Sequence, residues 1–271
     1  MKITTETIYN TFKDLRQDVF IEKVRDLTLI KISDKHSMVI AVDSDGGIGP
    51  MEGDVVKISA YMSGRFAIRV PLLEILSSGA TPVAAFDMLT MPMNEVGTEI
   101  LRGVKDELKA AGLGTEFPIS GSTEDNVPTN MTGIGTTIVG MIHVDELRPG
   151  SSKEGDVIIS LGKPKSGPDD KITLDDIEIL SQESMYMLIN TDGVHDILPV
   201  GSHGIAYEVG QMAETAGLSV EYLENIELNI EKSAGPSTCI LASCNEKAYD
   251  ELKLNCLTPV FKIGKLQKEI S

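Results

Sequence analysis

Residues 38–49 read Met38-Val39-Ile40-Ala41-Val42-Asp43-Ser44-Asp45-Gly46-Gly47-Ile48-Gly49. The apolar run 38–42 predicts a buried strand, and two carboxylates followed by three glycines stand at its end. Glycines let backbone N–H groups approach an anion closely, but the carboxylates repel that anion unless a divalent cation lies between them. Mg²⁺ binds in this way, through one or two carboxylates, water and phosphate oxygens. The alternative interpretation of these residues is a simple Asp- and Gly-rich turn between two strands.

The composition is that of a globular protein with one large domain or two ordinary ones: 271 residues, 41% hydrophobic and 24% charged. A formal net charge of −17 argues against nucleic-acid binding. The sequence shows neither an apolar run of about 18 residues nor a signal-peptide core, so we expect a cytoplasmic protein without a membrane span. Cys239, Cys244 and Cys256 match no zinc-site spacing and are expected to be buried thiols in a reducing compartment.

Strands and helices alternate irregularly along the chain, which predicts an α+β (mixed α/β) fold. Helices are expected near 6–19, 64–78, 94–111, 174–183 and 204–216. Strands are expected at 26–31, 37–42, 55–58, 83–89, 133–142, 157–161 and 185–190, a loop at 120–130, and a β/α/β portion over 237–264. The polar, turn-rich segment 147–156 is the candidate boundary, so we expect an N-terminal domain over 1–150 and a C-terminal domain over 151–271.

A second acidic loop has the sequence Ile119-Ser120-Gly121-Ser122-Thr123-Glu124-Asp125-Asn126. Its small residues permit close approach to a phosphate, and Glu124, Asp125 and Asn126 offer oxygens to a hard cation. The alternative is an acidic, solvated turn. Two such loops, with Asp54 just after the first, favour a shared metal–phosphate site.

Several other polar residues have two interpretations each. Glu74 lies between Leu73 and Ile75 in a predicted helix, and a half-buried carboxylate there needs either a metal or a cationic partner. Lys163 and Lys165, in the Gly/Pro-rich loop 162–168, either bind phosphate or belong to a solvated turn.

Two positions in the C-terminal half also have alternative interpretations. Ser202 precedes a predicted helix, where it either helps to form an anion site or caps the helix. His195, beside Asp192 and Asp196, is either an acceptor-site residue or an ordinary loop residue.

The run Gly64–Pro82, G-R-F-A-I-R-V-P-L-L-E-I-L-S-S-G-A-T-P, resembles a helix of the aminoimidazole ribonucleotide (AIR) synthetase superfamily. This superfamily includes thiamine-monophosphate kinase and selenophosphate synthetase, and its pattern G-R-x-A-x-x-V-N-x-x-D-I-x-A-M-G-A-x-P aligns without a gap. The second acidic loop stands where the superfamily has G-G-D/E-T. This sequence departs from the pattern at Pro71 for Asn, Glu74 for Asp, and Ser122 for the acid after the paired glycines. Within the superfamily, residues 43–49, 121–129 and 196–204 are most similar to the α-ribazole kinase (α-ribazole-5-phosphate synthase) family.

The resemblance implies an AIR synthetase-like two-domain fold. In such a fold the N-terminal sheet and its helices form a dimeric, barrel-like interface with a second copy, and an α/β domain follows. It implies that ATP binds in the N-terminal domain, with Mg²⁺ ions between its phosphates and the chain. The implied metal ligands are Asp43, Asp54, Glu74, Glu124 and Asp125. The implied ATP-binding residues are Gly46, Gly47, Gly49, Gly121, Ser122, Thr123 and Lys163. Asp45 and Asp43 are the catalytic candidates, with Asp45 binding metal or orienting the acceptor hydroxyl.

The resemblance also implies an activity. The first hypothesis is Mg²⁺- and ATP-dependent phosphorylation of the 5′-hydroxyl of α-ribazole, a step in salvage of the lower ligand of cobalamin. The second is a thiamine-monophosphate kinase or another ATP-dependent enzyme of the superfamily. The third, from a different class, is a nucleotide-binding maturation or regulatory protein without turnover. The expected partners are a small nucleoside-like substrate and a second copy of the chain, with neither nucleic acid nor membrane.

Overall fold

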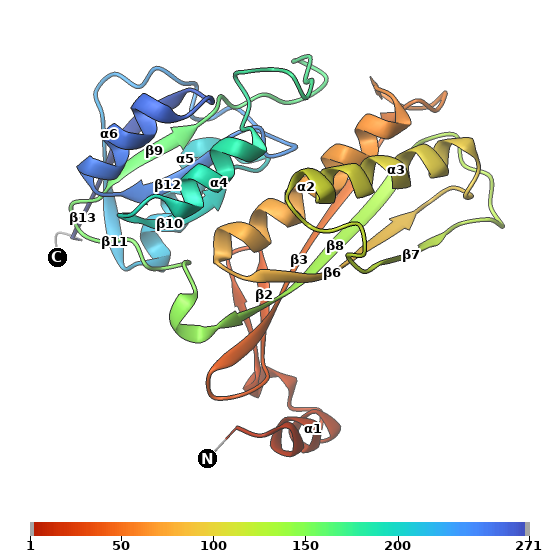
Figure 1. The fold of residues 1–271 in the computed structure, drawn as a ribbon, viewed down its shortest axis with the longest axis horizontal. Coiled ribbons are helices and arrows are strands. Elements are labelled where there is room, and N and C mark those ends of the chain that lie inside the picture. The colour runs from red at the N-terminus through yellow and green to blue at the C-terminus, as the bar shows by residue number, and fades with distance from the viewer. Residues whose placement is uncertain (1–2, 269–271) are drawn as a thin grey trace. The chain divides into compact units, whose positions relative to one another are not determined.

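The computed structural model describes residues 3–268 and divides into two compact units, Met1–Leu147 (unit 1) and Arg148–Ser271 (unit 2) (Figure 1). Each unit has its own sheet, helices and apolar core. None of the helices within the described residues is long and apolar enough to cross a membrane. The mixed α+β class predicted from the sequence is confirmed.

Unit 1 consists of a six-stranded sheet, a small two-stranded sheet and three helices. In chain order the elements are α1 (Thr5–Lys13), β1 (Ile21–Val24), β2 (Leu27–Lys31), β3 (His36–Gly46), β4 (Ile48–Gly49), β5 (Val56–Lys57), α2 (Ala60–Ser78), β6 (Thr81–Leu89), α3 (Glu95–Ala110), β7 (Ile119–Thr123) and β8 (Gly133–His143). Short 3₁₀ turns occupy Gln17–Val19 and Val144–Glu146.

The large sheet has the strand order β1-β2-β3-β8-β6-β7. Strand β8 is antiparallel to both β3 and β6, whereas β7 is parallel to β6. Strands β3, β6 and β7 therefore run in the same direction, and their carboxyl ends lie at one edge of the sheet. We call this edge, together with the loops that leave it, the site edge.

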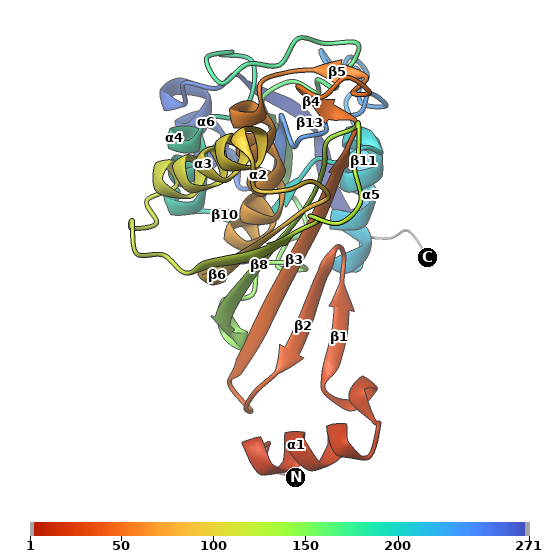
Figure 2. The same cartoon turned by 90° about the vertical axis from the view of Figure 1, so that its right-hand side faces the viewer.

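Helices α2 and α3 lie together on one face of this sheet (Figures 1 and 2). Side chains alternate along β3, so Val39 and Ala41 are buried beneath the helices while Val42 is 63% exposed on the other face. The helices contribute Ile68, Leu72 and Val104 to the same core, among other residues. The alternation fixes which face each acidic side chain at the end of β3 occupies.

Helix α2 begins at Ala60, four residues before the predicted start, because Ser59 caps it by accepting a hydrogen bond from the Met62 N–H at 3.3 Å. Gly79 ends it in a left-handed conformation, with φ of 89°. Pro71 lies inside the helix, where it cannot donate to the carbonyl of Ala67. The hydroxyl of Thr136 on β8 donates to that carbonyl instead, at 2.8 Å. The Pro71 departure from the superfamily pattern is thus compensated locally.

Unit 2 is built on a five-stranded antiparallel sheet of order β10-β12-β9-β13-β11. Its elements are β9 (Val157–Leu161), α4 (Gln182–Asn190), β10 (Val194–Pro199), α5 (Gly204–Thr215), β11 (Leu218–Tyr222), β12 (Ile240–Cys244), α6 (Glu246–Asn255) and β13 (Val260–Lys268). Cys239 and Cys244 are buried as predicted, and Cys256 is half-buried. Burial raises the pKa of the Cys239 and Cys244 thiols to about 12, so they are poor nucleophiles.

Two secondary-structure predictions in unit 2 are wrong. The helix expected at 174–183 and the strand expected at 185–190 are replaced by a loop followed by helix α4. Ser181 starts this helix by accepting a hydrogen bond from the Ser184 N–H, and the buried Met185 and Leu188 lie one turn apart on it. The short apolar run that suggested a strand is the inner face of this helix, an ambiguity inherent in short runs.

Five strands of the described residues were also missed. They are β1, β4, β7, β10 and β11, and β7 falls where a loop was expected at 120–130. Strand β7 reads Ile-Ser-Gly-Ser-Thr, which lacks the apolar alternation used to find strands.

Candidate functional site

One row of residues crosses four neighbouring strands at the site edge. Asp43 of β3 pairs with Thr136 of β8, Thr136 pairs with Asp87 of β6, and Asp87 pairs with Gly121 of β7. Paired residues point to the same face of a sheet, and Thr136 points at α2. Asp43 and Asp87 therefore both lie on the helix-covered face, on either side of Thr136. Asp45 follows on the same face of β3, next to the glycine turn.

Asp87 is a candidate site residue that the sequence analysis missed. Its side chain is on the buried face of β6, and the residue is only 4% exposed. The signal in the sequence was a lone carboxylate inside the apolar run 83–89, in phase with the buried Ala85 and Leu89. Gly121 lies close against it, since a Cβ atom on residue 121 would be 2.0 Å from the Asp87 carbonyl oxygen and 2.5 Å from its Oδ1.

The three carboxylates of this edge share one electrostatic property. Burial raises the pKa of Asp45 to about 7, and the nearby charge of Asp43 contributes to the same rise. Burial also raises the pKa of Asp43, against a smaller opposing effect of the Ser44 backbone N–H. Burial raises the pKa of Asp87, partly offset by its own backbone N–H and by Lys105 of α3. Such carboxylates are stabilised in the ionised form when a cation binds beside them.

A glycine turn follows these acids and is fixed to the loop before β8. Gly47 has φ of 72°, which favours glycine, and its N–H donates to the Thr132 carbonyl at 2.8 Å. Asp54 is 5% exposed, and its carboxylate accepts hydrogen bonds from the Met51 N–H and from both the N–H and the hydroxyl of Thr132, each at 2.7 Å. The carboxylate of Asp54 therefore connects its own loop, through Met51, to the loop before β8, through Thr132.

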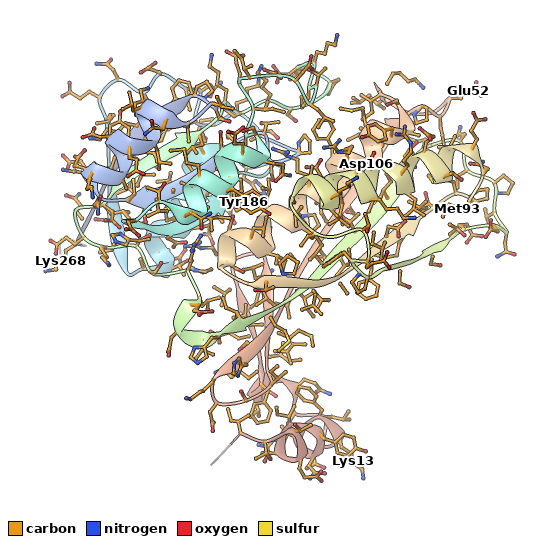
Figure 3. The ribbon with its side chains drawn as sticks, viewed as in Figure 1. Lys13, Glu52, Met93, Asp106, Tyr186 and Lys268 are labelled. Carbon is orange, nitrogen blue, oxygen red and sulfur yellow. The ribbon has the colours of Figure 1, made fainter. Side chains whose placement is uncertain are left out.

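A pocket of about 630 Å³ opens beside this turn. It is lined by Gly46, Gly47, Thr90 and residues 128–132, and its volume is typical of a small-molecule site. A Cβ atom on Gly46 would meet nothing within 4 Å, so this glycine faces open space. Thr90 and residues 128–132 were not predicted as site residues, because their role depends on a fold that brings them next to Gly46. Glu52 and Met93 mark this end of unit 1 in Figure 3.

The remaining predicted residues of unit 1 are distributed around this edge. Gly49 is buried, and a Cβ there would lie 2.3 Å from the Thr132 hydroxyl, so it serves close packing of the two loops. Glu124 accepts hydrogen bonds from the Asn126 and Val127 N–H groups, and Asp125 accepts one from the Thr123 hydroxyl. These two acids stabilise their own turn.

Two more site residues were predicted: Ser122 from the second acidic loop and Glu74 from the predicted helix 64–78. Ser122 is exposed on β7. Glu74 is half-buried on α2, two turns after Ala67, the residue that contacts Thr136.

The donor set fits Mg²⁺ better than a metal that is held by the protein alone. Within residues 3–268, no three His, Cys, Asp or Glu side chains are placed to hold one ion. The edge instead offers separate carboxylates at Asp43, Asp45 and Asp87, on strands where the residues that follow, Gly46 and Thr90, line the pocket. Mg²⁺ commonly takes one or two carboxylates and completes its shell with water and substrate phosphates. The residues present therefore fit phosphate-bound Mg²⁺.

The predicted positions in unit 2 have partners of their own. Lys163 pairs with Glu178, with 2.5 Å between Nζ and Oε1. His195 Nδ1 lies 2.8 Å from the buried Asp156 carboxylate, and its Nε2 lies 2.9 Å from Lys153 Nζ. His195 is thus part of a hydrogen-bonded chain.

The prediction that Ser202 caps helix α5 is wrong. His203 occupies the N-cap position without a side-chain hydrogen bond, and the Ile230 carbonyl accepts from the Ala206 N–H at the start of the helix. A backbone carbonyl therefore accepts from an N–H group at the start of this helix.

Comparison with known proteins identifies relatives of both the sequence and the fold. Residues 24–142 match the family model described as AIR synthase related protein, N-terminal domain. The chain is 28% identical over 217 residues to the selenide, water dikinase of Pseudomonas straminea, covering 73% of this chain and 56% of that enzyme. The chain spans about half the length of the curated relatives it matches.

Two solved structures share the architecture. Thiamine monophosphate kinase from Aquifex aeolicus superposes with a TM-score of 0.62 and 15% identity, covering 95% of this chain and 94% of that one. T. maritima PurL complexed with AMPPCP superposes with a TM-score of 0.63 and 16% identity, covering 96% of this chain and 44% of that one. The chain therefore shares the fold of the Aquifex aeolicus kinase and of part of T. maritima PurL, as the resemblance implied.

Proposed function

We propose that this protein is an ATP- and Mg²⁺-dependent phosphotransferase acting on the hydroxyl of a small molecule, with its reaction centre at the site edge of unit 1. The observation that carries the proposal is the row Asp43–Thr136–Asp87, which places two burial-perturbed carboxylates on one face of the sheet, three residues before the pocket-lining Gly46 and Thr90, respectively. Phosphoryl transfer requires mainly positioning and charge neutralisation, and this edge supplies parts for both. The likeness to nucleotide-dependent enzymes supports the same class.

The roles follow from the electrostatics. Asp43 and Asp87 would each hold a Mg²⁺ ion together with phosphate oxygens, and the bound ions would neutralise the charge of the triphosphate. Gly46 and Gly47 would lie along the phosphates, because both line the pocket and Gly46 faces open space. Gly121, Ser122 and Thr123 would border the same site, with Ser122 lacking the acid of the superfamily motif. Asp54 and Glu124 would act indirectly, through the loops that they hold.

Asp45 is the proposed base. Its pKa of about 7 lies near a working pH at which a carboxylate both accepts and releases a proton readily. The acceptor hydroxyl oxygen forms a bond to the γ-phosphorus, the bond from that phosphorus to the β–γ bridging oxygen breaks, and ADP leaves. The hydroxyl proton passes to the Asp45 carboxylate.

The acceptor that we propose is α-ribazole, through its 5′-hydroxyl, in salvage of the cobalamin lower ligand. Three stretches of sequence support this choice: residues 43–49, 121–129 and 196–204. Thiamine monophosphate is the second candidate, supported by the superposition that covers nearly all of both this chain and the Aquifex aeolicus kinase.

A homodimer is part of the proposal. The face of the unit 1 sheet opposite α2 and α3 exposes large apolar side chains, and within residues 3–147 no helix covers it. Val42, Thr137 and Phe86 form one row across this face, with Val42 63% and Phe86 37% exposed. Contiguous exposed apolar side chains mark association surfaces. A second copy of the chain is the occupant we propose, and Val42→Asp should convert a dimer into a monomer in light scattering.

The function is tested by incubating the protein with ATP and Mg²⁺ and, in separate reactions, α-ribazole, thiamine monophosphate, selenide or no acceptor. Product masses are recorded beside ATP consumption. We expect α-ribazole alone to gain one phosphoryl group and Asp45→Asn to abolish the gain. Asp145→Asn, which changes an 84% exposed carboxylate in the same unit, should leave it unchanged. Gain on thiamine monophosphate would select the second candidate, and tight ATP binding without any product would indicate a maturation or regulatory protein.

A further inference from the structure

A long loop in unit 2 joins β9 to α4 and has neither helix nor strand (Figure 1). This 162–181 loop is closed at its neck, where the Lys163 N–H donates to the Glu178 carbonyl at 2.8 Å. The Leu180 N–H donates to the Thr238 carbonyl and fixes the exit of the loop to the body of unit 2. Irregular connections of this length inside compact units are usually functional, and the closed neck makes this one a compact Ω-type loop.

Two lysines at the neck converge on one carboxylate. Lys163 Nζ lies 2.5 Å from Glu178 Oε1, and Lys165 Nζ lies 2.7 Å from Glu178 Oε2. Lys165 also contacts Asp176 Oδ2 at 2.7 Å. Each oxygen of Glu178 thus accepts from a different ammonium, so the two cations are already arranged around a single anionic group.

A second carboxylate of the loop is held in a similar way. Asp170 accepts from the Lys232 ammonium at 2.7–2.8 Å and from the Ser166 N–H at 2.8 Å. Carboxylates of the loop thus accept hydrogen bonds from ammonium and backbone N–H groups. These are the donor types that proteins use to bind phosphate.

A phosphoryl group is a stronger ligand for such donors than a carboxylate, because it carries more charge and a third oxygen. The two lysines keep the pKa of Glu178 at about 2, so this carboxylate stays ionised throughout the neutral range. Protonation therefore does not break these ion pairs at neutral pH, whereas a competing anion does. The side chains of Lys163 and Glu178 are about two-fifths exposed, so such an anion has access to them.

We propose that a phosphoryl group of a small phosphorylated ligand displaces Glu178 from Lys163 and Lys165, so that the 162–181 loop occupies this anion site until the ligand arrives. The exchange of carboxylate for phosphoryl group rests only on residues of unit 2. Glu178 is thereby an internal competitor, and displacing it removes the side-chain ion pairs that reinforce the backbone hydrogen bond at the neck.

The first experiment measures binding of inorganic tripolyphosphate to the full chain by calorimetry without Mg²⁺. Glu178→Gln removes the competitor, and we expect its Kd to be five- to tenfold lower than that of the wild type. Lys165→Met should weaken binding about tenfold. The matched control is Glu246→Gln, since Glu246 also bridges two lysines, Lys262 and Lys265, at 3.2 and 3.4 Å. An equal gain in both glutamine variants, or no gain in Glu178→Gln, would overturn the proposal.

The second experiment measures how readily a protease cleaves the 162–181 loop once its ion pairs are broken. Trypsin cleavage at the exposed Lys171, inside the loop, should accelerate when tripolyphosphate is added to the wild type. In Glu178→Gln, cleavage should be fast without the probe. Asp176→Asn, which removes the other carboxylate of Lys165, should give a smaller change in the same direction and serves if Glu178→Gln folds poorly. Probe-independent cleavage in all three proteins would contradict the proposal.

Further arms separate the sources of the phosphoryl group and the two proposals. Competition with tripolyphosphate by ATP and ADP would assign the phosphoryl group to a nucleotide, competition by the phosphorylated acceptor alone would assign it to the product, and competition by none of them would overturn the proposal. The probe needs no turnover. If no acceptor is phosphorylated but Glu178→Gln still binds tripolyphosphate more tightly, the exchange stands and the kinase assignment fails. If an acceptor is phosphorylated but Glu178→Gln binds tripolyphosphate no more tightly, the kinase assignment stands and the exchange fails.

Discussion

The carboxylates of the site edge in unit 1 and those of the 162–181 loop in unit 2 have opposite surroundings. Burial raises the pKa of Asp43, Asp45 and Asp87, and Lys105 is the cation that partly offsets this effect at Asp87. Two lysines hold the pKa of Glu178 far below its ordinary value. A bound metal ion would stabilise the ionised form of the unit 1 carboxylates. Glu178 already has two lysine ammonium groups beside it. An acidic motif in the sequence therefore shows its function only once the surrounding charges are known.

The comparison predicts unequal costs for removing a carboxylate from the two units. Asp87→Asn should reduce phosphotransferase turnover 100- to 1000-fold, because in the proposed function Asp87 supplies a charge that holds the metal–phosphate complex. Glu246→Gln, which removes a lysine-paired carboxylate of unit 2, should change kcat by less than about twofold. Steady-state kinetics at saturating ATP and Mg²⁺ measure both. Turnover of Asp87→Asn within about threefold of the wild type would show that Asp87 does not belong to the site.

The close contact between β6 and β7 predicts a difference between two glycines of unit 1. Gly121→Ala should lower the free energy of unfolding by about 2–3 kcal/mol, because the new Cβ would lie 2.0 Å from the Asp87 carbonyl oxygen. Gly46→Ala should be close to neutral, since its Cβ meets nothing within 4 Å. Urea denaturation of both variants tests the pair. Equal stability would mean that β7 is free to move away from β6.

The pKa of Asp45 predicts how stability depends on pH. The Asp45 carboxyl binds its proton more tightly in the folded state than in the unfolded state. Its contribution to the free energy of unfolding is therefore fully present below about pH 4. It is lost as the pH rises to about 7, and is constant above that. We expect a loss of about 3 kcal/mol between about pH 4.5 and 7.5 in denaturant titrations, with Asp43 and Asp87 changing stability in the same direction. Asp45→Asn should reduce the slope, and millimolar Mg²⁺ should restore stability at the upper end of this range. Glu178 acts at lower pH, where its contribution is lost as the pH falls from about 4.5 towards 2.

The open space at Gly46 predicts a smaller effect on nucleotide binding. Gly46→Ala places a methyl group in the pocket, so the KM for ATP should rise about fivefold, or about 1 kcal/mol, while the acceptor KM is unchanged. The comparison variant is Gly114→Ala, which also meets nothing within 4 Å but lies outside the pocket-lining residues. An unchanged KM for ATP in Gly46→Ala would show that the glycine turn does not contact the ATP phosphates.

The sequence predicted the parts of the site that follow one another along the chain. The strand 38–42 with its acidic, glycine-rich end is visible from alternation and turn chemistry, and it forms β3 and the turn after it. Asp87 was missed because a single acid in an apolar run has no motif of its own. Only the pairing of β6 with β8 and β7 places it in line with Asp43. The pocket threonines depend on the same long-range pairing.

Other departures have local causes that a pattern does not reveal. Pro71 looked like the loss of a functional Asn, but Thr136 supplies the hydrogen bond that proline removes from α2. The residues 174–183 carry a mixture of apolar and acidic residues that suggested a helix. The acids Asp176 and Glu178 instead bind lysines and keep that segment in the loop.

The row Asp43–Thr136–Asp87–Gly121 draws its members from four strands that are far apart in the sequence, and this has a consequence for biogenesis. A chain emerging from the ribosome does not possess the site until Thr136 has been synthesised and β8 has inserted between β3 and β6. An unfolded or half-made chain therefore lacks the proposed nucleotide site, and a ligand specific for the row binds the native state alone. Mass action then stabilises the finished protein by RT ln(1 + [L]/Kd), so the cellular ATP concentration itself would set how long this protein survives.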